Sequence, residues 1–382
     1  MVYHYVTNVT ERCINLTISF MAGRRIQGLG SDLTATALPS GSVGGWKLLD
    51  REQLTGAGNN ITVSGLTDKR YLMFLSHGIA SSSNPVMAIQ YNNDSSGTNG
   101  VNGNYSARLT TNGSSGSTFT YQTQAGLSGG GLDTGAGLTV GYIANKSDKE
   151  KLSLGHFCNG ATIGSGVAPD IGFFTGKWAN TSNSISTINI KNNNTGSFAV
   201  NSELVVLAYD PSDTSTSNFW QELTTKTSTS ESNTVTTDVV TPKKYNWVQV
   251  FIPYSTGSAD NFDFRVGTNS ISTSGYCQRY DIDGGAGGAG TQINQPYIRM
   301  AFNISSGSEW LFANIFFINN SSNEKLFISN AVRSESASQP PHRYETGGKW
   351  ITSGQVNIFQ ILHQNGASNL GTGSIIKWWG AD

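Results

Sequence analysis

Two stretches of this chain, GFFTGKWANTS at 172–182 and YETGGKWITSG at 344–354, carry the same Gly-Lys-Trp triplet. The two triplets begin 348 − 176 = 172 residues apart. Other matched stretches follow in the same order at nearly the same spacing: KRY at 69–71 with KKY at 243–245, NKSDKEKL at 145–152 with NSSNEKL at 320–326, and SELVVLAYD at 202–210 with SIIKWWGAD at 374–382. Anchors in one order with almost constant spacing indicate a tandem duplication.

The duplication predicts a domain plan. Residues 46–210 and 220–382 form two repeats, each of ordinary domain size. The polar stretch at 211–219 is the predicted linker. Residues 1–45 are predicted to form an extended N-terminal arm, because LTATALPSGSVGG at 33–45 has no sustained hydrophobic period. Met21 heads a second natural-looking start, so residues 1–20 have the character of an upstream-start extension.

Short apolar runs predict the fold class. WVQVFI at 247–252, YIRMAFNI at 297–304 and LFANIFFI at 311–318 are rich in β-branched and aromatic residues and too short for typical helices. Turn-forming clusters such as NNDSSGTNG at 92–100 separate such runs. We therefore expect an all-β protein of two tandem jelly-roll-type β-sandwich domains, preceded by the extended arm.

The repeated triplet also predicts which side chains are buried. Successive residues of a strand point to opposite faces of the sheet. Trp178 and Trp350 are expected to anchor the two cores, so Lys177 and Lys349 are expected on the opposite, solvent-exposed face.

Composition excludes several partners. Charged residues make up 13% of the chain, against about 25% in average proteins. The net charge of −1 gives no general affinity for nucleic acid or for an anionic membrane. No run approaches the roughly 18 apolar residues of a membrane-spanning helix. We expect neither a nucleic-acid nor a membrane partner.

No recognisable arrangement of catalytic, cofactor-binding or metal-binding residues is found in the sequence. Gly285, Gly287 and Gly290 have dinucleotide-loop spacing, but a Pro-containing strand-like segment follows where a helix is required. DIDG at 281–284 opens like a calcium loop but lacks the later acidic ligand. The five histidines share no metal spacing and adjoin no nucleophile motif. We expect a protein that is not an enzyme, with no cofactor and no metal.

One matched polar pair is a candidate binding site. Tyr105 and Arg108 correspond to Tyr276 and Arg279 at a spacing of 171 residues. Residues three apart on a strand face opposite sides, so one member of each pair is expected inside and the other outside. The pairs are either a structural feature of the fold or a site at which the arginines contact a subunit or a glycan.

The ordered motifs of the first repeat resemble those of virion proteins of tailed phages. These motifs are Trp46-x-Leu-Leu, Lys69-Arg-Tyr-Leu, Asn104-Tyr-Ser-x-Arg, Glu150-Lys-Leu, GKWANTS and SELVVLAYD. The second repeat is similar but more diverged, and the arm is similar to the leaders that tether such domains. The resemblance implies a structural protein at the surface of the virion. Together with the lack of a catalytic arrangement, it leads us to expect a non-enzymatic tail fibre, spike or head-decoration component, in contact with host-surface glycans.

The expected partners are other copies of the chain, as a trimer, and other virion proteins reached through residues 1–45. Three alternatives remain open. One is a pair of glycan-binding modules that acts outside any virus. Another is a double-jelly-roll capsid shell protein, although the halves of such proteins are usually more diverged than these. The last is a polysaccharide hydrolase, which needs only two carboxylates at the right separation.

Overall fold

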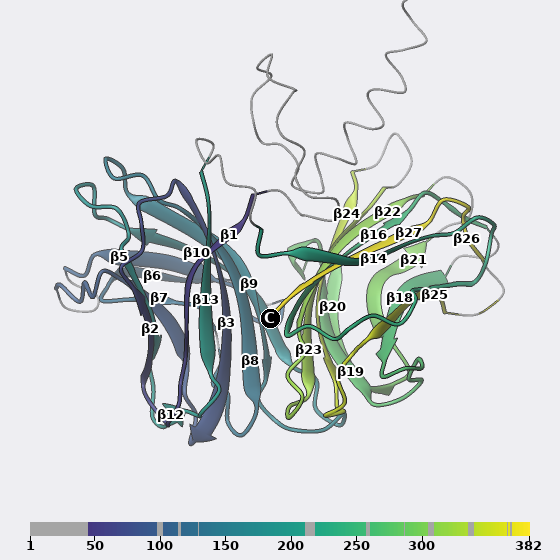
Figure 1. The fold of residues 1–382 in the computed structure, drawn as a ribbon, viewed down its shortest axis with the longest axis horizontal. Helices are drawn as coiled ribbons and strands as arrows, with labels where there is room; N and C mark the ends of the chain where they lie inside the picture. Colours follow the sequence, from purple (N-terminus) through teal and green to yellow (C-terminus); the bar gives the residue numbers. More distant parts are fainter. Residues whose placement is uncertain are drawn as a thin grey trace, which may run out of the picture.

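The computed structural model describes residues 45–97, 102–113, 116–128, 130–210, 218–256, 260–285, 287–304, 309–334, 340–364, 366 and 369–382. The predicted arm lies outside these residues except for Gly45, and the predicted linker except for Asn218 and Phe219. The regular secondary structure of the described residues is β-strand throughout, apart from one short 3-10 segment (Figure 1). The predicted all-β fold of sandwich type is confirmed.

The first sandwich, called repeat 1 below, pairs a large sheet with a small one, and all its pairings are antiparallel. The large sheet has the order β1-β13-β3-β8-β9-β10-β5-β6, with β12 beside β3. Its strands are β1 (Lys47–Gln53), β3 (Tyr71–Ser82), β5 (Tyr105–Leu109), β6 (Ser117–Gln122), β8 (Ala136–Ala144), β9 (Lys151–Gly160), β10 (Asp170–Trp178), β12 (Ser197–Phe198) and β13 (Glu203–Tyr209). The small sheet, β2-β11-β4-β7, consists of β2 (Asn60–Ser64), β4 (Met87–Tyr91), β7 (Ala125–Gly126) and β11 (Thr187–Asn192).

The second sandwich, called repeat 2, has the same plan. Its large sheet has the order β14-β27-β16-β22-β23-β24-β19-β20. These strands are β14 (Gln221–Thr227), β16 (Tyr245–Ile252), β19 (Tyr276–Ile282), β20 (Gly288–Gln295), β22 (Leu311–Ile318), β23 (Lys325–Arg333), β24 (His342–Trp350) and β27 (Ile375–Ala381). The small sheet, β15-β25-β18-β21, consists of β15 (Thr234–Thr236), β18 (Asp260–Gly267), β21 (Ile298–Ile304) and β25 (Ile358–His363), and β17 (Ser255–Thr256) pairs with β26 (Asn369–Leu370).

Alternation along each strand builds the two cores. In β16, Val248, Val250 and Ile252 are buried between the sheets of repeat 2, while the residues between them point to the other face of the large sheet. The predicted core anchors are confirmed, because Trp178 and Trp350 are buried in the corresponding cores. Each sandwich therefore has its own hydrophobic core between its two sheets.

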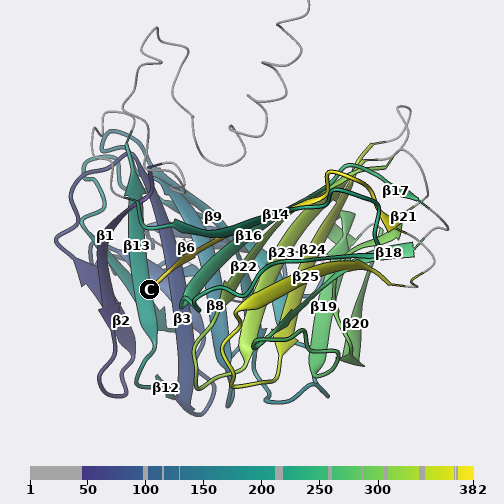
Figure 2. The same ribbon diagram turned by 45° about the vertical axis from the view of Figure 1, so that its right-hand side comes forward.

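The two large sheets also pack against each other through their outer faces, so the two repeats lie side by side (Figure 2). This third core joins strands β3, β8, β9 and β13 of repeat 1 to β16, β22, β23 and β27 of repeat 2. Gly347 of β24 permits the close approach, because a Cβ atom there would lie 1.9 Å from the Ile171 side chain. The repeats thus share an apolar interface in addition to the chain that links them.

One end of this interface is closed by the loop at 161–169, between β9 and β10. The Gly164 amide donates to a Glu324 carboxylate oxygen at 2.6 Å, and the Lys349 ammonium donates to the Thr162 carbonyl. Lys349 is fully buried and pairs with Glu324 at 3.3 Å. The prediction that Lys349 is solvent-exposed is therefore wrong, because the outer face of its strand is covered by repeat 1. Lys177, its equivalent, lies half-exposed on an uncovered outer face, which agrees with the prediction, and pairs with Glu150.

Candidate functional site

Tyr105 and Tyr276, the tyrosines of the two candidate pairs, lie inside the sandwiches. The Tyr105 hydroxyl donates to the Tyr91 carbonyl at 3.2 Å and accepts from the Tyr91 amide at 2.8 Å. The Tyr276 hydroxyl makes the same pair of bonds with Val266, at 2.7 and 2.9 Å. Each ring also stacks on the core tryptophan of its repeat. Both tyrosines are fully buried, so their polar groups are used in holding the two sheets of a sandwich together.

Arg108 and Arg279, the arginines of the same pairs, lie on the outer faces of the large sheets, as their three-residue spacing from the buried tyrosines predicts. Arg108 is exposed. Arg279 reaches across to repeat 1, where its Nε donates to the Pro169 carbonyl at 2.9 Å and its guanidinium lies 3.5 Å from the Asp170 carboxylate. Arg279 is therefore a contact between the two repeats of one chain.

A row of polar side chains crosses the outer face of the large sheet of repeat 2. Strand register places one member on each of six neighbouring strands, directly opposite the next, and all six point away from the core. Listed from β27 to β19, this polar row consists of Lys377, Gln249, Asn314, Asn330, Glu345 and Asp281. Neighbouring members are about 4.8 Å apart, the spacing of strands in a sheet.

Aromatic side chains flank the polar row on both sides. Toward the closed end, Trp247 and Phe316 stack with ring centroids 5.5 Å apart. On the other side of the polar row, toward the open end of the cleft away from the 161–169 loop, Phe251 and Phe312 are cross-strand partners on the same face. The ring of Trp310 packs on that of Phe251, with centroids 6.2 Å apart. Trp310 is 42% exposed, so this end of the sheet face presents aromatic surface to solvent.

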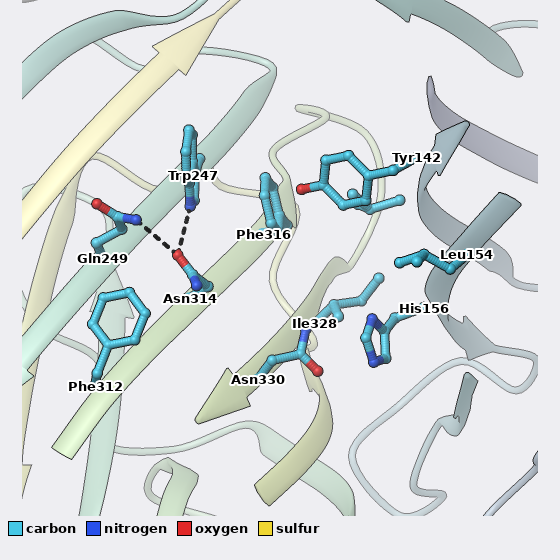
Figure 3. A pocket seen from close by; sticks show the side chains of 11 residues that line it. Tyr142, Leu154, His156, Trp247, Gln249, Phe312, Asn314, Phe316, Ile328 and Asn330 are labelled. Atoms are coloured by element: carbon cyan, nitrogen blue, oxygen red, sulfur yellow. Dashed lines mark hydrogen bonds between the residues drawn. The ribbon is translucent and has the colours of Figure 1, made fainter. Parts of the chain in front are cut away.

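Repeat 1 supplies the opposite wall of a cleft over the polar row. Tyr142, Leu154 and His156 face Asn314, Asn330 and the aromatic rings across a space of about 440 Å³ (Figure 3). A second hollow of about 470 Å³ shares His156 and Asn330 with the first and extends to Glu345, Arg343 and Asp281. The two hollows therefore follow one another along the polar row.

The two asparagine side chains in the cleft differ in their hydrogen bonding. The Asn314 carbonyl oxygen accepts from the indole nitrogen of Trp247 at 3.1 Å and from the Gln249 amide nitrogen at 3.0 Å (Figure 3). The Asn330 side-chain oxygen is buried and has no hydrogen-bond partner among the described residues. A buried carbonyl oxygen without a donor is costly, and a ligand hydroxyl in the cleft would satisfy it.

A charged group spans the cleft at its second hollow. The His156 imidazole lies 3.5 Å from the Glu345 carboxylate, and Arg343 lies 3.6 Å from the same carboxylate. Burial opposes ionisation of Glu345, but the hydrogen bond to His156 and the nearby positive charges hold its pKa below the usual range. A carboxylate that stays ionised accepts hydrogen bonds and is a poor general acid.

Within the described ranges, no group of three or more His, Cys, Asp or Glu side chains is placed to hold a metal ion. The same part of the chain contains no helix that is long and apolar enough to span a membrane. The chemistry that the cleft offers is hydrogen bonding from amides and ions together with contact to aromatic rings.

Sequence reasoning missed this cleft. Its only local signal is a polar residue in an outward position of an otherwise apolar strand, such as Gln249 in WVQVFI or Asn314 in LFANIFFI. Those two residues are 65 apart in the chain, and only the register of β16 with β22 makes them neighbours.

Comparisons with known proteins give no family for this chain. No protein-family model matches it, and no curated protein matches it. Among solved structures it is similar to domains LG4-5 of the mouse laminin alpha1 chain (9% identity, covering 87% of this chain and 90% of that one, TM-score 0.18) and to the LG1-3 region of the laminin alpha2 chain (8%, 85% and 64%, TM-score 0.19). It is also similar to the exoplasmic/lumenal domain of VIP36 in its Ca²⁺/Man-bound form (7%, 42% and 78%, TM-score 0.17). Likenesses this weak carry no conclusion about this chain.

Proposed function

We propose that this chain is a non-enzymatic glycan-binding structural protein, and that it serves on the particle of a tailed phage. The polar row beneath the inter-repeat cleft carries the glycan-binding part of this proposal. The resemblance of the repeat 1 motifs to those of tailed-phage virion proteins supports the rest.

The cleft has the side-chain composition that a sugar requires. Small-molecule sites combine apolar and aromatic walls with a few well-placed polar groups. A sugar ring offers C–H faces that pack on aromatic rings. Its hydroxyl groups pair with side-chain amides, which donate and accept hydrogen bonds, and with carboxylates, which accept them. Phe312 supplies such a ring surface, and Asn330 supplies an acceptor without a partner among the described residues.

The ionisation of Glu345 supports binding by this group rather than acid catalysis. Glycosidases require one carboxyl group that remains protonated until it donates to the leaving oxygen, and such a group has a raised pKa. Glu345 has a lowered pKa. In the proposed function this carboxylate accepts hydrogen bonds from sugar hydroxyls.

The test is a glycan-array screen of the full chain, followed by calorimetric titration of the best binder. We expect Phe312→Ala and Asn330→Ala to weaken binding by about fivefold to tenfold each, which corresponds to about 1 to 1.4 kcal/mol. Gln360→Ala is the control, because Gln360 lies in the small sheet of repeat 2, hydrogen-bonded to Thr236. Equal affinity of all three variants and the unaltered chain would remove the cleft as the binding site.

Assembly is a separate part of the proposal. We expect the chain to form a closed oligomer, as a trimer, through residues 1–45, since symmetric assembly multiplies weak glycan contacts. Light scattering of the full chain and of residues 46–382 measures this directly. A monomer in both forms would contradict assembly through the arm while leaving the cleft's binding function untouched.

A further inference from the structure

We infer that the cleft takes an extended, uncharged oligosaccharide that runs across the strands along the polar row, spanning several sugar units. This inference rests on the proposed glycan-binding function and names the ligand class. It follows from the length of the row, the direction in which the cleft is open, and the charges at its far end.

The length comes from strand register. The two hollows together cover the row from Gln249 on β16 to Asp281 on β19, which is four strand spacings. At about 4.8 Å a spacing, this stretch is roughly 19 Å long. A single sugar ring fills only a fraction of that length, while an extended chain presents a new ring at steps comparable to the strand spacing.

The direction comes from what surrounds the row. Toward the closed end, the apolar contact between the repeats includes Phe316 and Ile328, and the loop at 161–169 lies beyond it. An oligosaccharide running parallel to the strands would meet this apolar contact two residues beyond Asn314 and Asn330. A chain running across the strands instead passes from one hollow to the other over Asn330, the residue that both hollows share.

The charge preference comes from the second hollow. It contains the carboxylates of Asp281 and Glu345, the guanidinium group of Arg343 and the imidazole of His156. Arg343 and His156 both lie against Glu345. Asp281 and Glu345 are directly opposed across β19 and β24. A uronic or sialic acid at this end would bring a third carboxylate into the same partly buried space, and like charges in such places repel strongly.

The test is calorimetric titration of the full chain with neutral oligosaccharides of one to six units from the cello, malto and chito series, and with oligogalacturonates of the same lengths. For at least one neutral series we expect affinity to rise about fivefold per added unit, the effect of one net hydrogen bond, and to level off near four units. We expect no binding of oligogalacturonates, and we expect Glu345→Gln to gain detectable affinity for them.

The outcomes separate the two claims. Neutral sugars that bind with the same affinity at every length would overturn the extended mode while leaving glycan binding in place. Oligogalacturonates that bind more tightly than the neutral series would overturn the charge preference alone. Failure of every probe, together with a blank glycan array, would overturn the proposed function and this inference with it. Asn330→Ala should weaken long and short neutral chains alike, because it lies where the hollows meet.

Discussion

The same four-residue patch occurs once in each repeat, and its two copies have opposite surroundings. In repeat 2 the patch consists of Glu324, Leu326, Ile328 and Lys349, and in repeat 1 of Glu150, Leu152, Leu154 and Lys177. Leu326 and Ile328 are 1% and 4% exposed, whereas Leu152 and Leu154 are 56% and 48% exposed. Each patch holds the same lysine–glutamate pair, at 3.3 Å in repeat 2 and 3.1 Å in repeat 1.

The difference shows that the two repeats do not meet symmetrically. Repeat 1 covers the patch of repeat 2 with its 161–169 loop and the outer face of its large sheet, but repeat 2 leaves the patch of repeat 1 open beside the cleft. A symmetric contact would have closed both ends and left no cleft. The open end, where Leu154 faces the polar row, is therefore a consequence of this asymmetry.

The polar row of repeat 2 also differs from the matching positions of repeat 1. Its members Gln249, Asn314 and Lys377 have the counterparts Leu75, Val140 and Val205 in repeat 1, at spacings of 174, 174 and 172 residues. Those three apolar residues are buried in the contact between the repeats. Repeat 1 thus uses these positions for apolar packing, whereas repeat 2 places polar side chains there, two of which, Gln249 and Asn314, line the cleft.

The largest expected effect comes from breaking the buried copy of the ion pair. Lys349→Met leaves Glu324 beneath the loop without its cation and should lower the free energy of unfolding by roughly 3 to 5 kcal/mol. Lys177→Met removes the exposed copy and should cost under about 1 kcal/mol. Urea denaturation of both variants measures the difference, and equal losses would show that the closed end does not form in solution.

The leucines give the next largest effect. Leu326→Ala opens a cavity in the contact between the repeats and should cost about 2 to 5 kcal/mol. Leu152→Ala, at the matching exposed position, should change stability by about 0.5 kcal/mol or less. Thermal unfolding of the pair is the measurement. A large loss for Leu152→Ala would mean that something covers the open patch.

The third expected effect is a dependence of stability on pH that comes from the buried His77. Burial, with the positive charges of Lys244 and Lys325, lowers the pKa of His77 from 6.5 to about 3. The neutral form is thus favoured in the folded chain, so this stability is present above pH 6.5 and lost as pH falls from 6.5 toward 3. The loss should be about 1.4 kcal/mol per pH unit.

Replacement of His77 checks this assignment. His77→Phe introduces the residue found at the matching position of repeat 2, Phe251, since 251 − 77 = 174. Urea midpoints measured between pH 7 and pH 4.5 should fall less steeply for this variant than for the unaltered chain. Identical slopes would assign the acid sensitivity to other groups.

Local patterns were enough to predict the fold but not the site. The buried Trp178 and Trp350, and the opposite faces of Tyr105 and Arg108, follow from strand alternation alone. The candidate site is assembled from strands far apart in the chain. Gln249, Asn330 and Asp281 become members of one row only through the pairing of β16, β22, β23, β24 and β19.

The sequence by itself determined that this protein consists of β-strands in sandwiches, because the period of its apolar residues and its turn clusters allow little else. It did not determine which outer sheet face would be covered. Both copies of the Gly-Lys-Trp triplet predict an exposed lysine, yet Lys349 is buried and Lys177 is not. Burial of an outer face depends on which other surface packs there, and that was decided only when the two large sheets came together at one end and left the polar row open at the other.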